Sequence, residues 1–90
     1  MNYKVTSRKI SDGSYGVKYF YKERTVTEKF LFLTREVTEK YVDEECKSDA
    51  LDFARLSFKS GEYQDVFLDL EETDHDGIFY KTIWKNGRWA

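Results

Sequence analysis

Alternating apolar and polar positions predict strands in the first third of the chain. One-sided alternation runs over Tyr3–Ser7 and again over Tyr15–Tyr21, which is the period of a half-buried strand. The Asp12–Gly13 dipeptide between these segments favours a hairpin turn. A third strand is expected over about Val26–Leu33, where the closing four apolar residues indicate a central position in the sheet.

The segment Thr34–Glu45 is compatible with two structures. Val37 and Tyr41 lie four residues apart, as on one face of a helix, whereas the β-branched residues of the segment favour a strand. We expect a helix. Arg35–Tyr41 also echoes Arg24–Phe30, eleven residues earlier, and we interpret this single short echo as chance rather than as a repeat.

Helical periodicity is clearest over Ser48–Ser60. The first residue of this segment is a suitable N-cap, its apolar residues project mainly to one side, and Gly61 is placed to end the helix in a left-handed conformation. A last hairpin is expected from two alternating segments, Asp65–Glu71 and Ile78–Lys85, joined by a turn at Glu72–Gly77.

Strands on both sides of a helical centre predict an α+β fold. We expect an antiparallel sheet of about five strands, in the order β-β-β-α(α)-β-β, with one or two helices packed on one face. Asn86–Gly87 is expected to end the last strand. Ninety residues without a linker-like stretch indicate a single domain over residues 1–90.

Cysteine content and hydropathy bear on location. Cys46 is the only cysteine, and a lone thiol favours a reducing compartment. The first residues lack the apolar core of a signal peptide. The longest apolar run, Phe30–Leu33, is far too short to span a bilayer. We therefore expect a soluble, cytoplasmic protein that is not associated with a membrane.

The charges are segregated along the chain. Met1–Arg35 contains eight bases and three acids, Glu36–Asp76 fourteen acids and four bases, and Gly77–Ala90 three bases and no acid. The formal net charge of −2 conceals this asymmetry, which bears on partners rather than on fold.

The acidic centre suggests a protein partner with a basic surface. Complementary charge would steer the encounter, and a terminal tryptophan would serve as an anchor. We therefore expect a non-enzymatic inhibitor, adaptor or regulator, of the kind that phages use against nucleic-acid-handling host proteins. The candidate partner-binding residues are Asp43, Glu44, Glu45, Asp49, Asp52, Glu71, Glu72, Asp74, Asp76 and Trp89.

Two alternatives use the sheet. If the helix covers Tyr15, Val17, Tyr19 and Tyr21, the opposite face is basic and aromatic, which suits single-stranded nucleic acid. The residues for that role are Lys4, Arg8, Lys18, Phe20, Lys22, Phe79, Lys81 and Lys85. A homodimer would instead use the apolar residues expected on that outer face, namely Phe20, Phe79 and Ile83.

Catalytic and metal-binding motifs are weak. Glu72–Gly77 resembles the start of a calcium-binding EF-hand loop, but its twelfth position is the apolar Ile83 where a bidentate Glu is needed. His75 is the only histidine, and Cys46 lies in an acidic stretch that disfavours a thiolate. We expect no enzyme activity, no catalytic residue, no metal and no cofactor.

Overall fold

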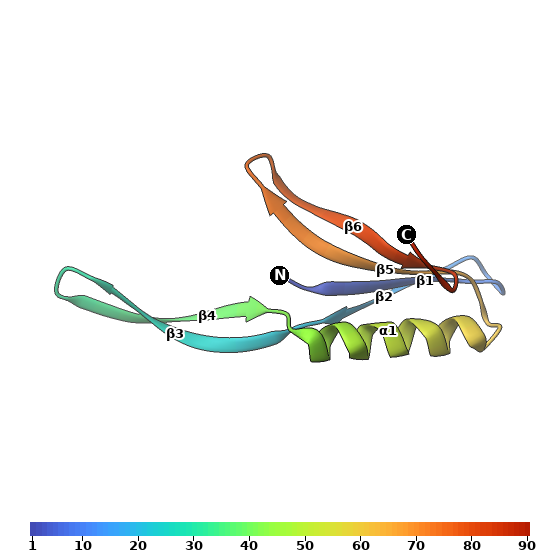
Figure 1. The fold of residues 1–90 in the computed structure, drawn as a ribbon, viewed down its shortest axis with the longest axis horizontal. Helices are drawn as coiled ribbons and strands as arrows, with labels where there is room; N and C mark the ends of the chain where they lie inside the picture. The colour runs from blue at the N-terminus through green and yellow to red at the C-terminus, as the bar shows by residue number, and fades with distance from the viewer.

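Seven strands and one helix make up the protein. The computed structural model describes all residues 1–90 and has the order β-β-β-β-α-β-β-β, so the expected α+β class is confirmed (Figure 1). The elements are β1 Tyr3–Lys9, β2 Tyr15–Phe20, β3 Lys22–Phe30, β4 Leu33–Tyr41, α1 Glu44–Lys59, β5 Tyr63–Asp74, β6 Gly77–Lys85 and β7 Arg88–Trp89.

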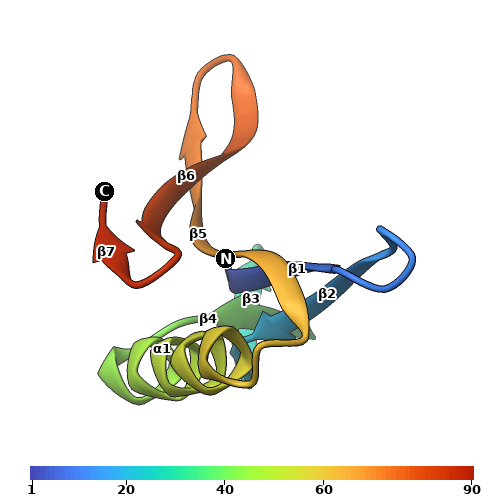
Figure 2. The ribbon, with the colours of Figure 1, turned by 90° about the vertical axis from the view of Figure 1, so that its right-hand side faces the viewer.

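The strands form two separate sheets. Five strands make an antiparallel sheet in the order β2-β1-β5-β6-β7, and β3 pairs only with β4. Helix α1 packs against β5, β1 and β2 on one face of the larger sheet, and the other face is uncovered (Figure 2). No helix combines the length and the apolar content that crossing a bilayer requires.

A small core lies between α1 and the larger sheet. Ala50 and Ala54, one turn apart and fully buried, let the helix lie close to the strands. Trp84 meets the ring of Phe58 edge-on at 6.3 Å between centroids, an arrangement that aromatic pairs favour. The eight buried core residues are Tyr3, Val5, Cys46, Ala50, Ala54, Val66, Leu68 and Trp84.

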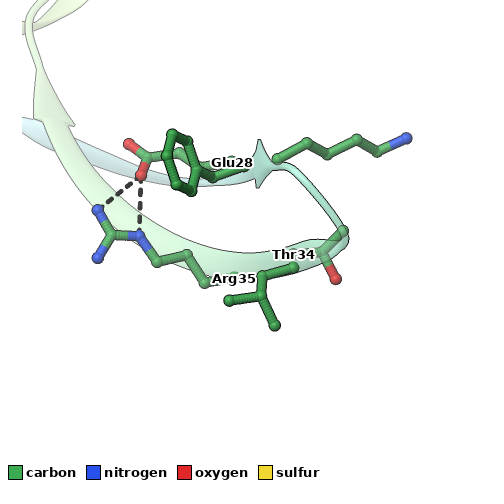
Figure 3. Close-up of a pocket in the computed structure, with 6 residues that line it drawn as sticks. Glu28, Thr34 and Arg35 are labelled. Atoms are coloured by element: carbon green, nitrogen blue, oxygen red, sulfur yellow. Dashed lines mark hydrogen bonds and ion pairs between the residues drawn. The ribbon is translucent and has the colours of Figure 1, made fainter.

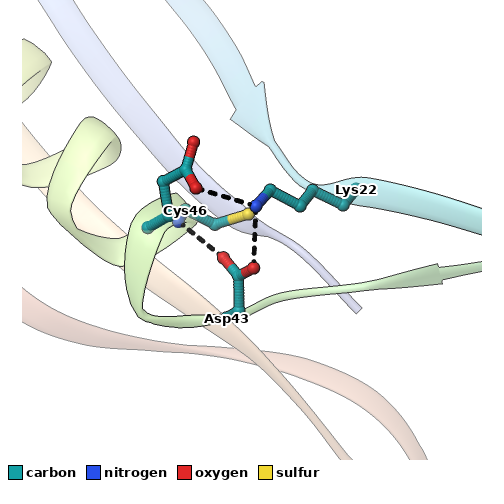
Figure 4. Close-up of polar contacts among 4 residues, drawn as sticks. Lys22, Asp43 and Cys46 are labelled. Atoms are coloured by element: carbon teal, nitrogen blue, oxygen red, sulfur yellow. Dashed lines mark hydrogen bonds and ion pairs between the residues drawn. The ribbon is translucent and has the colours of Figure 1, made fainter.

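The helix begins earlier than predicted. Asp43, not Ser48, is the N-cap, and its carboxylate accepts a hydrogen bond of 2.9 Å from the backbone N–H of Cys46. Lys22 Nζ donates to Asp43 at 2.8 Å and to Glu45 at 3.0 Å (Figure 4). The Asp43–Glu44–Glu45 sequence combines an N-cap with an acidic first turn, so it marks the helix start locally.

The contacts of Asp43 predict an acid-dependent stability. The hydrogen bond from Lys22, followed by that from the Cys46 N–H, lowers the pKa of Asp43 from 3.8 to about 2. A lowered pKa contributes stability above the unfolded value, and this contribution is lost as the pH falls toward 2. Asp43→Asn keeps a good N-cap but removes the charge. Its urea midpoint is expected to lie below that of the wild type at pH 5, and the gap to narrow below about pH 4 and to close as the pH approaches about 2. A gap that is constant between pH 5 and pH 2 would contradict this account.

The segment expected to be a second helix is a strand. Residues 34–41 belong to β4, which pairs with β3 over nine positions from Lys22↔Tyr41 to Phe30↔Leu33. The β-branched residues therefore decided the local structure, against the helical spacing. Phe30–Leu33 is not a central strand segment either, because these residues form the end of the β3–β4 hairpin.

The prediction of which β2 residues lie under the helix was wrong, because the residues that face the helix are one position away from those expected. The register Val5↔Lys18 and Tyr3↔Phe20 places Lys18 and Phe20 on the helix side, where the Phe20 ring lies 5.7 Å from that of Phe53. The alternate positions of β2, which carry two tyrosines and a valine, point to the uncovered side and are at least half exposed. A shift of one residue exchanges the two faces of a strand, and pairing with β1 sets this register.

Candidate functional site

A projecting hairpin dominates the shape of the molecule. The β3–β4 hairpin, residues 22–41, extends away from the body and is called the arm (Figure 1). The molecule measures 57 × 26 × 25 Å. The arm is joined to the body through Tyr21 and through the Val42–Asp43 connection to α1, and the Lys22 ion pairs with Asp43 and Glu45 close that junction.

The arm has one amphipathic face and one polar face. In an antiparallel pair, directly opposite residues share a face. Val26 lies opposite Val37, and Phe30 lies opposite Leu33. Two ion pairs share this face: Glu28–Arg35 lies between the two apolar pairs, and Arg24–Glu39 lies beyond the valine pair, toward the body. The other face carries only threonines and charged residues, namely Glu23, Thr25, Thr27, Lys29, Thr34, Glu36, Thr38 and Lys40.

Near its end, the arm forms a shallow concave site. Arg35 Nη2 lies 2.8 Å from Glu28 Oε2, and the ion pair borders the apolar Phe30 and Leu33 (Figure 3). The site is lined by Glu28, Lys29, Phe30, Leu33, Thr34 and Arg35. The site suits an apolar group of a partner that is flanked by polar groups, because Phe30 and Leu33 are apolar and the charges of Glu28 and Arg35 neutralise each other.

Four consecutive apolar residues cap the arm. Phe32 is 101% exposed and Leu31 is 85% exposed, and Phe30 and Leu33 are each more than 70% exposed. Leu31 also has a φ of 56°, a left-handed conformation that costs a side-chain-bearing residue about 1–2 kcal/mol. Another two-residue turn, Asn86–Gly87, has residues that tolerate positive φ. Leucine at the arm turn is thus unfavourable locally, and a side chain that is 85% exposed gains little burial to offset the cost.

The acidic residues predicted to bind a partner lie in two separate places. Glu44, Glu45, Asp49 and Asp52 lie on the exposed side of the first half of α1 and are called the helix acidic patch. Asp43 lies beside them but is occupied as the N-cap and by Lys22.

The remaining acids are on β5 and its turn. Glu72 and Asp74 lie at the end of β5, and Asp76 lies in the turn to β6. This β5–β6 hairpin rises away from α1 (Figure 1). Glu71 is buried and accepts a hydrogen bond of 2.8 Å from the Asn2 side chain. The structure therefore does not join all the acids into one surface. Trp89 lies on β7 and is 55% exposed.

The uncovered face of the larger sheet, called the outer face, carries three of the eight residues predicted to bind nucleic acid. Lys4, Arg8 and Lys85 lie there, each over an aromatic ring. The rings belong to Tyr80, Tyr15 and Phe67, at 3.8, 5.4 and 5.5 Å from the cationic groups in that order. Arg88, opposite Lys85, adds a fourth base to this face, and three acids on the same face, Asp65, Asp69 and Glu71, offset most of the positive charge.

The other five nucleic-acid candidates lie elsewhere. Lys18 and Phe20 are on the helix side of β2, and Lys22 is held in its two ion pairs at the arm junction. Lys81 and Phe79 share the side of Leu70 on the β5–β6 hairpin. Ile83 and Phe20 pack against the core, so the outer-face dimer interface built on them is not present as predicted.

The arm was not predicted from the sequence. The apolar run Phe30–Leu33 suggested burial. Its two central residues instead form the turn between β3 and β4. The overlooked signal was the echo, because Arg-x-Val-x-Glu occurs at Arg24–Glu28 and again at Arg35–Glu39. Two such segments paired antiparallel place each arginine opposite a glutamate and valine opposite valine, which is the register that the structure has.

The structure contains no candidate metal site. No group of three or more His, Cys, Asp and Glu side chains is arranged to hold a metal ion, and Cys46 is a buried free thiol. Comparisons with known proteins also found no match: no protein-family model matches the chain, and neither a curated protein nor a solved structure matches it.

Proposed function

We propose that the protein is a small, non-enzymatic binding protein that contacts another protein through the arm, as an inhibitor, adaptor or regulator. The observation that carries this proposal is the cluster of four exposed apolar residues at the end of a projecting hairpin. Exposed apolar clusters of this kind mark interaction sites. A cytoplasmic location belongs to the proposal, because the single thiol is free.

The exposed surface supports a binding role. A folded monomer of 10.8 kDa exposes about 5,500 Å², whereas this chain exposes 6724 Å². The radius of gyration is 16.6 Å, against about 12 Å for a compact domain of this length. The excess area of about 1,200 Å² exceeds the roughly 800 Å² that each partner buries in a typical stable complex.

The charge of the arm favours a protein partner over a phosphate polymer. The arm carries five bases and four acids, and two of its arginines are already paired with glutamates. A surface with apolar residues and balanced charge resembles the core and rim of a protein interface. The helix acidic patch lies next to the arm junction and would add electrostatic steering toward a basic partner.

Photo-cross-linking tests the proposal. With p-benzoylphenylalanine at Phe32, irradiation in source cells is expected to give a discrete adduct, because this side chain lies at the proposed contact. The same probe at Phe79, which is 43% exposed on β6, is the control for random collision. Adding Leu31→Ser is expected to reduce the Phe32 adduct at least tenfold, whereas Leu56→Ser, at an exposed leucine of α1, is expected to leave it unchanged.

Equal adduct patterns from Phe32 and Phe79 would contradict the arm as the contact element. The contribution of the helix acidic patch is tested separately by changing Glu44, Asp49 and Asp52 to lysine. This variant leaves the Asp43 cap and its ion pair with Lys22 intact. Undiminished adduct formation by the charge-reversed protein would remove the patch from the proposal.

Single-stranded nucleic acid is the second candidate, at the outer face. Exposed Tyr15 and Tyr19 with Lys4 and Arg8 offer stacking surfaces and cations. This candidate ranks second because the acids on the same face offset most of its positive charge. Binding to a labelled oligonucleotide that appears at low salt, weakens steeply with salt and is lost in Tyr15→Ala would favour it. Absence of binding at low salt would remove it.

A further inference from the structure

Both long edges of the arm are unpaired. Strands β3 and β4 are nine residues long and bond only to each other, without a bulge in their register. The chain contains no proline to block an edge. An isolated two-stranded hairpin is at best marginally stable in water, and a long free edge is a template for a further strand. A further strand is therefore expected to stabilise the arm, and its free edges can pair with one.

The sequence of β4 is complementary to itself. If two copies of β4 pair antiparallel around Val37, Arg35 of each copy lies opposite Glu39 of the other. The same register places Leu33 opposite Tyr41. Cross-strand pairs of opposite charge, and of aromatic with apolar residues, stabilise a sheet. No residue of β4 meets a like charge in this register.

The in-chain pairs extend this complementarity across four strands. Arg24 lies opposite Glu39 within one copy, and Glu39 would lie opposite Arg35 of the second copy. That arginine already lies opposite its own Glu28. Each such row would alternate in charge from β3 to β4 and on to the second β4 and β3. The central row would consist of valines alone.

The β3 edge is less suitable. Antiparallel pairing of two β3 strands around Val26 would place Phe30 opposite Lys22. Lys22 Nζ is held by Asp43 and Glu45, so the apolar ring would face a fixed ion-pair cluster. The β4 edge instead places apolar residues together, and its register brings Phe32 level with the half-buried Val42 of the second copy.

We infer that the partner of the arm is a second copy of this chain, joined by antiparallel pairing of the two β4 edges around Val37 into a four-stranded sheet. This inference rests on the proposal that the arm is a protein-binding element. A two-fold axis at Val37 makes the contact isologous, so it closes as a dimer rather than continuing into a filament. The excess exposed area of each chain is sufficient for a dimer of standard size.

Sedimentation equilibrium of the unmodified protein is the first test. The expected mass at micromolar concentrations is about twice the 10.8 kDa of one chain. A strictly monomeric profile up to millimolar concentration would overturn the inference. The proposed function would survive that result if the Phe32 probe still gave a heterologous adduct, and would fail separately if it gave none.

Disulfide trapping tests the edge. Val26 and Val37 are matched, because they lie opposite each other on one face of the arm. In a Cys46→Ala background, Val37→Cys is expected to form a covalent dimer under mild oxidation at least tenfold faster than Val26→Cys. In the proposed sheet only Val37 meets its own copy, while the Val26 positions are three strand spacings apart, about 14 Å. Faster trapping by Val26→Cys, or no trapping by either, would overturn the β4 contact.

Discussion

Leu68→Ala is expected to lower the free energy of unfolding by about 3–5 kcal/mol, the range for deleting a well-packed leucine from a core. Leu68 is fully buried, and only eight residues form the core around it. Because so few residues form the core, there is little surrounding material to relax into the cavity. A domain of this size has a total stability of the order of 5–13 kcal/mol, so this variant would lose a large part of it.

Leu56→Ala is the matched control for this prediction. It is the same substitution at a leucine that is 69% exposed on α1, and its expected effect is within about 0.5 kcal/mol. Urea unfolding followed by tryptophan fluorescence measures both, since Trp84 is buried beside the site. Protein concentration must be held constant, because association shifts apparent stability. Equal urea midpoints for the two variants would refute the proposed core.

Ala54→Asp is expected to destabilise the protein at pH 7 by about 3–5 kcal/mol, the cost of leaving a buried charge without a partner. Ala54 is fully buried and belongs to a core cluster that contains no basic residue. Burial raises the pKa of an introduced carboxyl group. The folded state would therefore bind a proton more readily than the unfolded state, and acid would relieve the destabilisation.

Ala54→Asn separates charge from shape in this experiment. The amide has nearly the same size but does not titrate, so the difference between the two variants reports the charge. The difference in urea midpoint is expected to be large at pH 7 and to shrink as the pH approaches about 4, the unfolded pKa of aspartate. A pH-independent difference would mean that water reaches position 54, against the helix packing described above.

Local signals predicted the fold class and several elements correctly. The Asp12–Gly13 turn, the long central helix, the left-handed Gly61 and the final β5–β6 hairpin are all present. Each of these depends on residues close in sequence, which is where turn chemistry, capping and periodicity act.

Pairing between distant strands was not predictable in the same way. Alternation in β2 allowed either face to be buried, and only the register with β1 decided that Phe20 faces the helix. The apolar run Phe30–Leu33 suggested burial because isolated patterns carry no information on whether a second layer covers them. The arm register itself was available from the two Arg-x-Val-x-Glu segments, since antiparallel complementarity needs no structure to be recognised.

The candidate site was only partly foreseen for the same reason. The acids of Glu44–Asp52 do share one exposed side of α1, which helical spacing implies. Glu71 was grouped with surface acids, but the structure buries it beside Asn2, a contact between residues far apart in sequence. Exposure of Phe32 likewise follows from where the arm points, and no local signal encodes that direction.

The length of the arm has a consequence for avidity. A nine-residue strand spans about 30 Å, so two arms overlapping around Val37 would hold the two bodies at opposite ends of a spacer of about that length. Each body would present one helix acidic patch. A target with basic sites repeated at a matching spacing would then be bound at both ends, and linked sites of this kind gain about 10²–10⁴-fold over one alone. Weakening the β4 contact would reduce binding to such a repetitive target without altering any residue that touches it.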